Sequence, residues 1–514
     1  MMEHLLTIVI FLPLLGGLVL LLGRRNETFV KAGGILVSLL TFAISLGLFF
    51  GYNPDNPAMQ YVDKVLWITD LNIGYHVGID GISMLLIVLT TFLTPIVLLS
   101  SWDSIKKQVP MYVFLMLLLE TGMLGVFSSL DTFLFYVFWE IILIPMYFII
   151  GIWGGKERIY ASIKFFLYTM AGSLLMLIAI IWLGWYASTL PGGQFTTDIT
   201  KLFEIAPGVP FEMQVWLFAA FALSFLIKVP AFPVHTWLPD AHVQAPTGGS
   251  VILAGVLLKM GTYGLIRFNL QLFPSVAIEY AGFLAAIGVI GIIYGALVSM
   301  VQKDVKKLVA YSSVSHMGFI LLGLFGMTTE GLQGGLIQMI NHGLSTGALF
   351  LIVGMIYDRR HTRMIEDFGG LAKSIPIFAT MFMIVTLSSI GLPGMNGFVG
   401  EFLILLGSFK SGVLGSPWYV IIAASGVVLA AVYMLWMFQR VVFGTIKHEE
   451  NAKLKDLNSR EIGLLLPIII LIFWIGLYPS TFLSKSEKSI QRVVNVLEEA
   501  HAQHGNGEDI TSAE

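Results

Sequence analysis

Apolar runs of about twenty residues recur from one end of this 514-residue chain to the other. Each run is long enough to cross a hydrocarbon core about 30 Å thick as a helix. Only 12% of the residues are charged, whereas a soluble domain has about 25%. We therefore predict an all-α polytopic membrane protein with about fourteen transmembrane helices, at residues 5–22, 30–50, 80–100, 111–130, 132–152, 164–186, 214–244, 248–270, 278–300, 308–326, 335–357, 377–407, 418–444 and 463–483.

The composition excludes several kinds of site. The chain has no cysteine, so it holds no disulfide, thiolate metal site or cysteine-ligated iron–sulfur cluster. A net charge of -3 gives no reason to expect a nucleic-acid partner, and the sequence has neither a Gly-rich nucleotide fingerprint nor a P-loop. No basic region precedes the first apolar run, so we expect an uncleaved first span rather than a secretory signal.

Most of the 29 Lys and Arg residues fall in alternate loops between the expected spans. The opposite loops hold only Lys64, Lys201, Arg267 and Lys410. Because basic loops stay on the inner side of a membrane, we expect both termini on the outer side.

Three basic residues, Lys164, Lys228 and Lys259, are left inside the spans once the loops and the C-terminal tail are accounted for. An ammonium at the centre of a bilayer helix costs about 2.5–3.5 kcal/mol, so such charges are typical of transport pathways. Comparable ionisable residues inside the expected spans are Glu120, Glu140, Glu401, His316 and His342.

Lys259 is the deepest of the three lysines. It follows Ser250 by nine residues, or roughly 14 Å of helix, which is too deep for easy snorkelling to the surface. No acid lies within one helical turn. Burial without a partner favours the neutral amine, so this lysine is a candidate to accept and release a proton.

The other ionisable residues have competing interpretations. Glu140 pairs with Lys228 on another helix, or is protonated and serves helix packing. His316 and His342 relay protons, or are packed and hydrogen-bonded; two His without nearby acids or cysteines make a poor metal site.

Lys164 faces Glu157 and Lys156 near a membrane edge, where snorkelling explains it nearly as well as function. Glu120 pairs with a neighbour or modulates Glu140, and the remaining candidates, which form a proton entrance or brace a broken helix, are His235, Asp240 and His242.

Two of the expected spans, the seventh and the twelfth, are interrupted by Pro and Gly in corresponding places. Pro230 and Pro233 follow Lys228, and the stretch from Gly391 to Gly400 precedes Glu401. A repeat offset by five helices inverts the second copy relative to the first, and broken helices in such repeats mark the site of secondary transporters. Prolines are also ordinary in membrane helices, but two breaks beside ionisable residues favour transport.

These motifs resemble those of the antiporter-like membrane subunits of respiratory complex I. The resemblance is carried by His235-Thr-Trp-Leu-Pro-Asp-Ala-His242, by Ala245-Pro-Thr-Gly-Gly-Ser-Val-Ile-Leu-Ala-Gly-Val-Leu-Leu-Lys259, and by the stretches around Glu140 and Glu401. Within that family the chain is similar to the M-type, because the long lateral helix of the L-type is missing. The resemblance implies fourteen helices with two inverted five-helix repeats and broken helices seven and twelve.

The same resemblance implies roles for the buried residues. Glu140 and Lys228 are then a switching ion pair, Lys259 the central proton carrier, and Glu401 the terminal carboxylate, with His316 and His342 on the polar axis between them. The expected function is proton translocation in a bacterial inner membrane, with the termini on the periplasmic side. The energy would come from partner subunits that hold NADH, FMN, iron–sulfur clusters and quinone; L-type and N-type subunits would be neighbours.

We expect the chain to divide into N-terminal helices at 1–110, a first repeat at 111–270, a second repeat at 278–444, a last helix at 463–483 and a peripheral tail at 484–514. The tail has one short apolar face, which indicates an interfacial helix, and we expect 501–514 to be disordered. Two alternative functions stay open. One is a subunit of a multi-subunit (Mrp-type) Na⁺/H⁺ antiporter, and the other is a structural or quinone-binding membrane subunit that pumps nothing.

Overall fold

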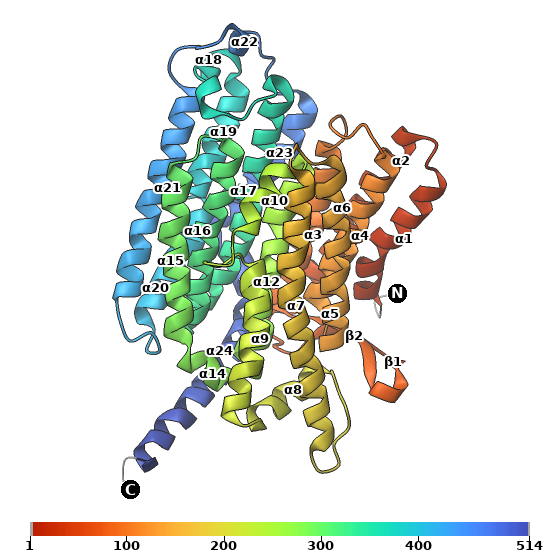
Figure 1. Cartoon of the computed structure of the whole chain (residues 1–514), viewed down its shortest axis with the longest axis vertical. Coiled ribbons are helices and arrows are strands. Elements are labelled where there is room, and N and C mark those ends of the chain that lie inside the picture. Colours follow the sequence, from red (N-terminus) through yellow and green to blue (C-terminus); the bar gives the residue numbers. More distant parts are fainter. Residues whose placement is uncertain (1–3, 512–514) are drawn as a thin grey trace.

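The computed structural model describes residues 4–511, which are mostly helical (Figure 1). Within these residues, 13 helical segments are long and apolar enough to cross a membrane. A further crossing is made by two shorter helices around a break, α19 (Pro376–Ser389) and α20 (Asn396–Lys410). The all-α class and the predicted number of spans are therefore confirmed.

The N-terminal part contains four spans, α1 (Leu5–Leu22), α2 (Glu27–Gly51), α3 (Gly81–Ser100) and α4 (Val109–Ser128). An antiparallel hairpin that was not predicted, β1 (Gln60–Ile68) and β2 (Ile73–Ile79), connects α2 to α3. A single 3-10 turn (Thr69–Leu71) separates the strands, and Asn72 closes it with a φ of 48°, a left-handed conformation that Asn tolerates. Asp80 then caps α3 by accepting from the backbone N–H groups of Ile82 and Ser83.

The next group begins with α5 (Thr132–Ile141), α6 (Leu143–Trp153), α7 (Arg158–Thr189) and the short α8 (Ile199–Ile205), which a 3-10 turn (Ala206–Gly208) follows. The predicted break in the seventh span is confirmed, because α9 (Phe211–Lys228) stops before Pro230 and α10 (Trp237–Gln244) begins after Pro233. Proline cannot donate a backbone hydrogen bond. The indole N–H of Trp237 donates to the carbonyl of Ile227 over 2.8 Å and satisfies a backbone group at the break.

The eighth span is irregular in an unusual way. It consists of α11 (Thr247–Ile252), a π-helical turn (Leu253–Leu257), α12 (Leu258–Gly264), a second π-helical turn (Leu265–Asn269) and α13 (Leu270–Leu272). Such π turns are rare and are found mostly at functional sites. Lys259 lies between them, and the whole span is surrounded by other parts of the chain. Sequence periodicity gave no sign of this geometry.

The second half contains α15 (Ala281–Met300), α16 (Val305–Phe325), α17 (Thr329–Arg360), α21 (Trp418–Val442) and α23 (Ser459–Leu477), with short elements α14 (Pro274–Glu279), a 3-10 turn (Ile365–Asp367), α18 (Leu371–Ser374) and α22 (Glu449–Ala452). The long helix α17 lies in the middle of the molecule (Figure 1) and packs against helices from both halves, including α3, α11, α16, α20 and α24. The most apolar stretch of α17 is fully buried inside the protein.

The predicted break in the twelfth span is also confirmed. Gly391 and Gly394 have φ values of 73° and 90°, which glycine adopts without steric cost. The chain thus leaves α19, turns and starts α20 at Asn396, so that Glu401 lies in the second turn of the new helix.

The C-terminal tail differs from the prediction. It forms α24 (Ser480–Thr511), which continues as a helix through the part of 501–514 that the structure describes. The predicted apolar face exists, since Ile490, Val493, Val494 and Leu497 are at most 2% exposed. It packs on the protein rather than on a membrane interface, because α24 contacts α3, α13, α14 and α17. The predicted apolar face is confirmed, but the prediction that it lies on the membrane interface was wrong.

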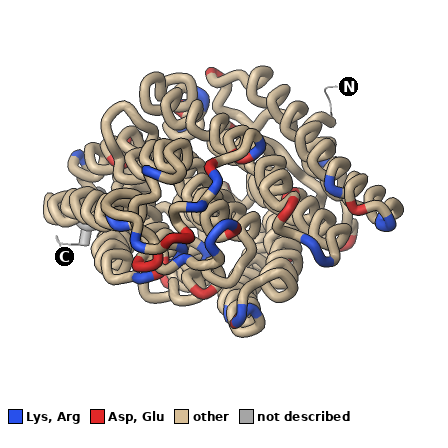
Figure 2. Tube along the Cα trace, turned by 90° about the horizontal axis from the view of Figure 1, so that it is seen from above, with Lys and Arg blue, Asp and Glu red and all other residues tan. Residues whose placement is uncertain are grey.

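Charged and apolar side chains are separated as expected for a membrane protein. Seen from above, charged positions gather on the loops and helix ends that face the viewer (Figure 2). Large apolar side chains are exposed along the outer helices, for example Leu36 on α2, Ile178 on α7 and Val428 on α21, each more than 60% exposed. These helices therefore form the surface toward lipid, and the span with Lys259 and helix α17 lie inside.

Candidate functional site

The centre of the candidate site is the contact between Lys259 and His342. Both side chains are buried, at 0% and 3% exposure. The Lys259 amine lies 2.6 Å from Nδ1 of His342 on α17 and donates to the carbonyl oxygen of Ala254, which belongs to the first π turn. The lysine is therefore held at full depth by a carbonyl of its own helix and an imidazole of α17, and the snorkelling alternative is excluded.

A row of ionisable side chains continues from this centre into the second half. The rings of His342 and His316 have their centroids 5.7 Å apart. Nδ1 of His316 lies 3.5 Å from the Oε1 atom of Glu401, and both residues are about 5% exposed. Lys259, His342, His316 and Glu401 come from four different spans, so the fold brings together all four of these sequence-predicted residues.

Neutral polar side chains, which were not predicted from the sequence, surround the middle of this row. Ser345 and Ser388 share a hydroxyl hydrogen bond of 2.6 Å, and the Ser388 hydroxyl lies 2.6 Å from Oδ1 of Asn396. The Oγ of Ser389 lies 3.4 Å from Nε2 of His316. The amide of Gln338 donates to Oε1 of Glu401 over 3.5 Å.

A small cavity lies along these side chains, with room for about one water molecule. Its lining includes both histidines and four further residues of α17, among them Gln338, Asn341 and Ser345. With His342 these three are spaced at i, i+3, i+4 and i+7, which places them on one helix face. That spacing is a sequence signal that could have found them.

Glu140 and Lys228 do not form the expected direct ion pair. No carboxylate of the described residues lies within 4.0 Å of the Lys228 amine, which also lacks a hydrogen-bond partner among them. The amine instead lies 5.5 Å from the ring centroid of Trp139 and 5.2 Å from that of Phe165, an arrangement that stabilises a cation through the ring faces.

The Glu140 carboxylate is half-buried on α5, close to Tyr136 and Ser173. Lys228 is the last residue of α9 before the break and points toward the aromatic rings. The two groups remain within electrostatic reach of each other. Glu140 and Lys228 therefore interact electrostatically, although their charged groups are not in contact.

The breaks and loops near α10 hold the remaining predicted candidates. Lys164 pairs over 2.7 Å with Asp240 of α10, a partner that was not predicted for it. His235 is buried beside the rings of Phe232 and Tyr294. His242 is fully buried and stacks on Phe350, with ring centroids 4.5 Å apart. Among the described residues, neither histidine has a hydrogen-bond partner for its ring nitrogens.

Lys306 is a functional candidate that was not predicted from the sequence. It lies in the first turn of α16, is 6% exposed and donates to the carbonyl of Ala245 over 2.6 Å. It also lines a polar hollow of about 610 Å³, together with charged residues that include Lys156, Glu157, Asp358 and Arg363. His242 lies within electrostatic reach of Lys306 and of Lys259, so the charge of either amine acts on its ring.

Two other buried groups lie apart from the row. Glu120 is fully buried on α4 near Thr94, and its carboxylate has no hydrogen-bond partner within the described part of the chain. Arg267, which was expected in a loop, is 2% exposed and pairs with Asp80 over 2.7 Å. The structure does not bring Glu120 into contact with Glu140.

The described residues contain no group of three or more His, Cys, Asp or Glu side chains that could hold a metal ion. The side chains of the row can exchange protons between amine, imidazole and carboxyl groups, with hydroxyls and amides between them.

Comparison with known proteins decides the family. Residues 129–432 match the family described as NADH:quinone oxidoreductase/Mrp antiporter, transmembrane region, and residues 5–126 match NADH-ubiquinone oxidoreductase chain 4, amino terminus. The chain belongs to this family. The match covers both broken helices and the whole row from Lys259 to Glu401.

Individual family members are similar along their whole length. The chain is 46% identical over 495 residues to NADH-quinone oxidoreductase subunit M of Rhodobacter capsulatus, covering 93% of this chain and 94% of that protein. It is 43% identical over 488 residues to NADH-ubiquinone oxidoreductase chain 4 of Marchantia polymorpha, covering 95% and 96%. The predicted resemblance to the M-type membrane subunits is confirmed.

Solved structures of the family have the same fold. A chain of respiratory complex I from Thermus thermophilus superposes with a TM-score of 0.86 at 32% identity, covering 96% of this chain and 99% of that one. A chain of the Mrp complex from Dietzia sp. DQ12-45-1b superposes with a TM-score of 0.84 at 20% identity, covering 97% and 99%. The Mrp likeness concerns the fold alone, and the sequence relatives favour the complex I branch.

Proposed function

We propose that this chain is the M-type membrane subunit that translocates protons in an NADH–quinone oxidoreductase of a bacterial inner membrane. The observation that carries the proposal is the buried row of Lys259, His342, His316 and Glu401, whose members lie on four spans. No soluble or purely structural role requires four ionisable residues in a line at this depth, where each is costly to bury.

Protons reach the row from the inner side through the polar hollow at Lys306. The hollow opens among basic and acidic loop residues, and Lys306 lies at its buried end. His242 connects Lys306 to Lys259, because it is within electrostatic reach of both. An imidazole with no fixed hydrogen bond can accept a proton on one ring nitrogen and release it from the other.

The central step passes the proton from Lys259 to His342 across the 2.6 Å contact. His342 and His316 are separated by more than a hydrogen bond, and a water in the cavity beside them would complete the path. Glu401 receives the proton at 3.5 Å from His316 and passes it toward the outer side.

Glu140 and Lys228 act as the switch that drives this step. When the Lys228 amine is released from the Glu140 field, its positive charge opposes a second positive charge on Lys259, and the proton leaves toward His342. The separation seen between the two groups, with the amine over Trp139 and Phe165, is the kind of state in which that charge is available. The aromatic faces stabilise the cation while it is away from the carboxylate.

Moving one proton outward against 100 mV requires about 2.3 kcal/mol. The energy comes from partner subunits in the membrane arm and beyond it, which bind NADH, FMN, iron–sulfur clusters and quinone. L-type and N-type antiporter-like subunits are the expected neighbours of this chain. Both chain termini lie on the periplasmic side, and the two inverted repeats at 111–270 and 278–444 supply one half-channel each.

The test uses the intact complex reconstituted in vesicles, with proton uptake measured on addition of NADH and a soluble quinone. The wild-type complex should acidify the vesicle lumen, and Lys259→Gln should lower proton uptake at least about tenfold. Exchange of ²²Na⁺ for protons without quinone reduction would contradict the proposal and favour the antiporter alternative. Unchanged pumping by the Lys259→Gln complex would favour a structural subunit.

A further inference from the structure

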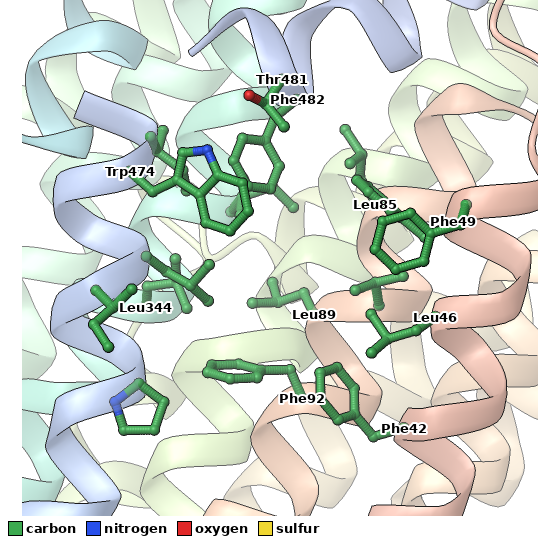
Figure 3. A pocket seen from close by; sticks show the side chains of 17 residues that line it. Phe42, Leu46, Phe49, Leu85, Leu89, Phe92, Leu344, Trp474, Thr481 and Phe482 are labelled. Atoms are coloured by element: carbon green, nitrogen blue, oxygen red, sulfur yellow. The ribbon is translucent and has the colours of Figure 1, made fainter. Parts of the chain in front are cut away.

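A deep apolar groove lies on the opposite side of α17 from the polar cavity's serines and amides. Its volume is about 450 Å³, within the range of small-molecule sites. Figure 3 shows it between α23 on the left and α2 on the right, with Thr481 and Phe482 of α24 at the top. Leu89 of α3 and Leu344 of α17 form its buried floor.

The walls of the groove are almost entirely hydrocarbon. Thr481 is the only residue of the lining outside the apolar and aromatic classes. Several wall side chains are also open to the membrane, since Phe50 is 76%, Ile470 53% and Trp474 48% exposed. An empty groove of this kind forfeits dispersion contacts along its whole lining, so in a bilayer it takes up an apolar chain.

The length of the groove favours one acyl chain over a partner helix. On α2 the lining runs from Phe42 to Phe50, which is about 12 Å along the helix axis. That is less than half of a hydrocarbon core of about 30 Å, whereas a spanning helix of a partner needs the full depth. The upper end lies at the membrane surface, because Phe50 is the penultimate residue of α2. The groove is therefore accessible from a single leaflet.

The positively charged side chain of Lys485 lies at the end of the groove nearest the membrane surface. The Lys485 amine lies 5.3 Å from the ring centroid of Phe49, which is a wall of the groove. Its hydrogen bond is a long one, 3.4 Å to the carbonyl of Tyr52, and no described carboxylate lies within 4.0 Å of it. An apolar slot that ends at a half-buried lysine matches the shape of a phospholipid, with the acyl chain inside and the phosphate at the amine.

We propose that the groove between α2, α3, α23 and α24 binds one acyl chain of a phospholipid whose phosphate binds Lys485. The lipid packs on Leu344, two residues from His342 on the same helix, and on Leu89, whose side chain lies against Gly343. It therefore fills space directly behind the helix that carries part of the polar row. The binding itself does not depend on the proposed pumping role.

The test uses the purified intact complex and phosphatidylglycerol that carries a photoactivatable diazirine in the middle of one acyl chain. Peptide mass spectrometry should locate the label on the groove faces of α2, α3 and α23. Ile470→Trp, which fills the groove, should lower labelling there at least about fivefold. Leu466→Trp is the matched control, since Leu466 lies one turn away on α23, is 47% exposed and is outside the lining.

The headgroup is tested by competition between phosphatidylglycerol and phosphatidylcholine. Lys485→Gln should reduce the preference for the anionic lipid about fivefold, the effect of one lysine near a charged surface. Lys488→Gln, one turn along α24 and exposed, should leave it unchanged. Equal labelling of all lipid-facing helices in every variant would overturn the proposal. So would crosslinks from a neighbouring subunit into the groove, because they would identify a protein as its occupant.

Discussion

The Lys259 amine and Nδ1 of His342 lie 2.6 Å apart, with no water needed between them. The contact joins the irregular eighth span to α17, and therefore the two halves of the molecule. Close approach of the two backbones makes it possible: a Cβ at Gly343 would clash with the carbonyl of Gly255 at 2.8 Å. Glycine at this crossing lets an amine and an imidazole from facing helices meet.

The first prediction concerns this contact. Lys259→Met should reduce NADH-driven proton uptake by at least about tenfold, since positioned proton-transfer groups contribute factors of 10²–10⁴. The size of the loss is measured with a lumenal pH dye in vesicles holding the complex. NADH oxidation by an artificial electron acceptor serves as the assembly control and should be unaffected. Pumping within a factor of two of wild type would show that the proton bypasses Lys259.

A second prediction tests the inner entrance. Lys306→Met should slow proton uptake several-fold, because it removes the titratable group at the buried end of the polar hollow. Lys303→Met is the matched control: Lys303 is exposed on the same side, three residues earlier. Both variants remove one positive charge from this surface. Equal losses would mean that surface charge, rather than proton transfer through Lys306, accounts for the effect.

A third prediction concerns the outer end of the row. Glu401→Gln keeps the shape of the side chain but removes its proton-accepting oxygen near His316, so pumping should fall at least about tenfold. Glu330→Gln is an acid-to-amide control, because Glu330 forms a partly exposed pair with Lys410 over 2.6 Å. Surface pairs contribute about 0–1 kcal/mol to stability, and that variant should pump normally. Equal pumping rates of the Glu401→Gln and Glu330→Gln complexes would refute the role of Glu401.

Part of this site followed from the sequence for a local physical reason. Lys259 and Glu401 stand out because a charge inside an apolar run is costly wherever the helix lies. The two broken helices stand out because Pro230 and Gly391 end a helix whatever surrounds them. Such signals need no knowledge of the neighbours.

Other parts depend on neighbours and could not be predicted. Lys306 is three residues from Lys303 along the chain, and only packing against Ala245 shows that one is buried and the other exposed. The direction in which Lys228 points is set by Trp139 and Phe165 on two other helices. Neutral groups such as Ser389 carry no charge that marks them in the sequence, and the contact of Ser389 with His316 forms only when the end of α19 packs against α16.

The fourth prediction uses the separation of Glu140 and Lys228. Because the groups are coupled electrostatically without a hydrogen bond, Glu140→Gln and Lys228→Met should each lower pumping about tenfold. The double variant should be no worse than either single variant, as for residues that act as a unit. Pumping rates of the four complexes, measured in the same vesicle preparation, give the comparison. Multiplicative losses would show that the two groups act independently.

The last prediction concerns the β hairpin outside the membrane. Burial raises the pKa of Asp198, but hydrogen bonds from His76, Lys64 and Thr200 outweigh it and hold the pKa below the ordinary range. The amine of Lys64, on β1, lies 2.5 Å from the carboxylate, and Nδ1 of His76, on β2, lies 3.3 Å from it. Through these two interactions, Asp198 links both strands to the loop before α8.

The sign of the pH effect follows from the lowered pKa. The stabilisation from Asp198 is fully present above its unfolded pKa of about 3.9 and is lost as the pH falls through the lower folded pKa. At pH 7, Asp198→Asn should loosen the hairpin by about 2 kcal/mol, seen as roughly 30-fold faster amide exchange in β1 of the intact complex. Asp70→Asn, at an exposed position of the same hairpin, should change nothing. If wild type and Asp198→Asn exchange equally at pH 7, the carboxylate does not hold the strands.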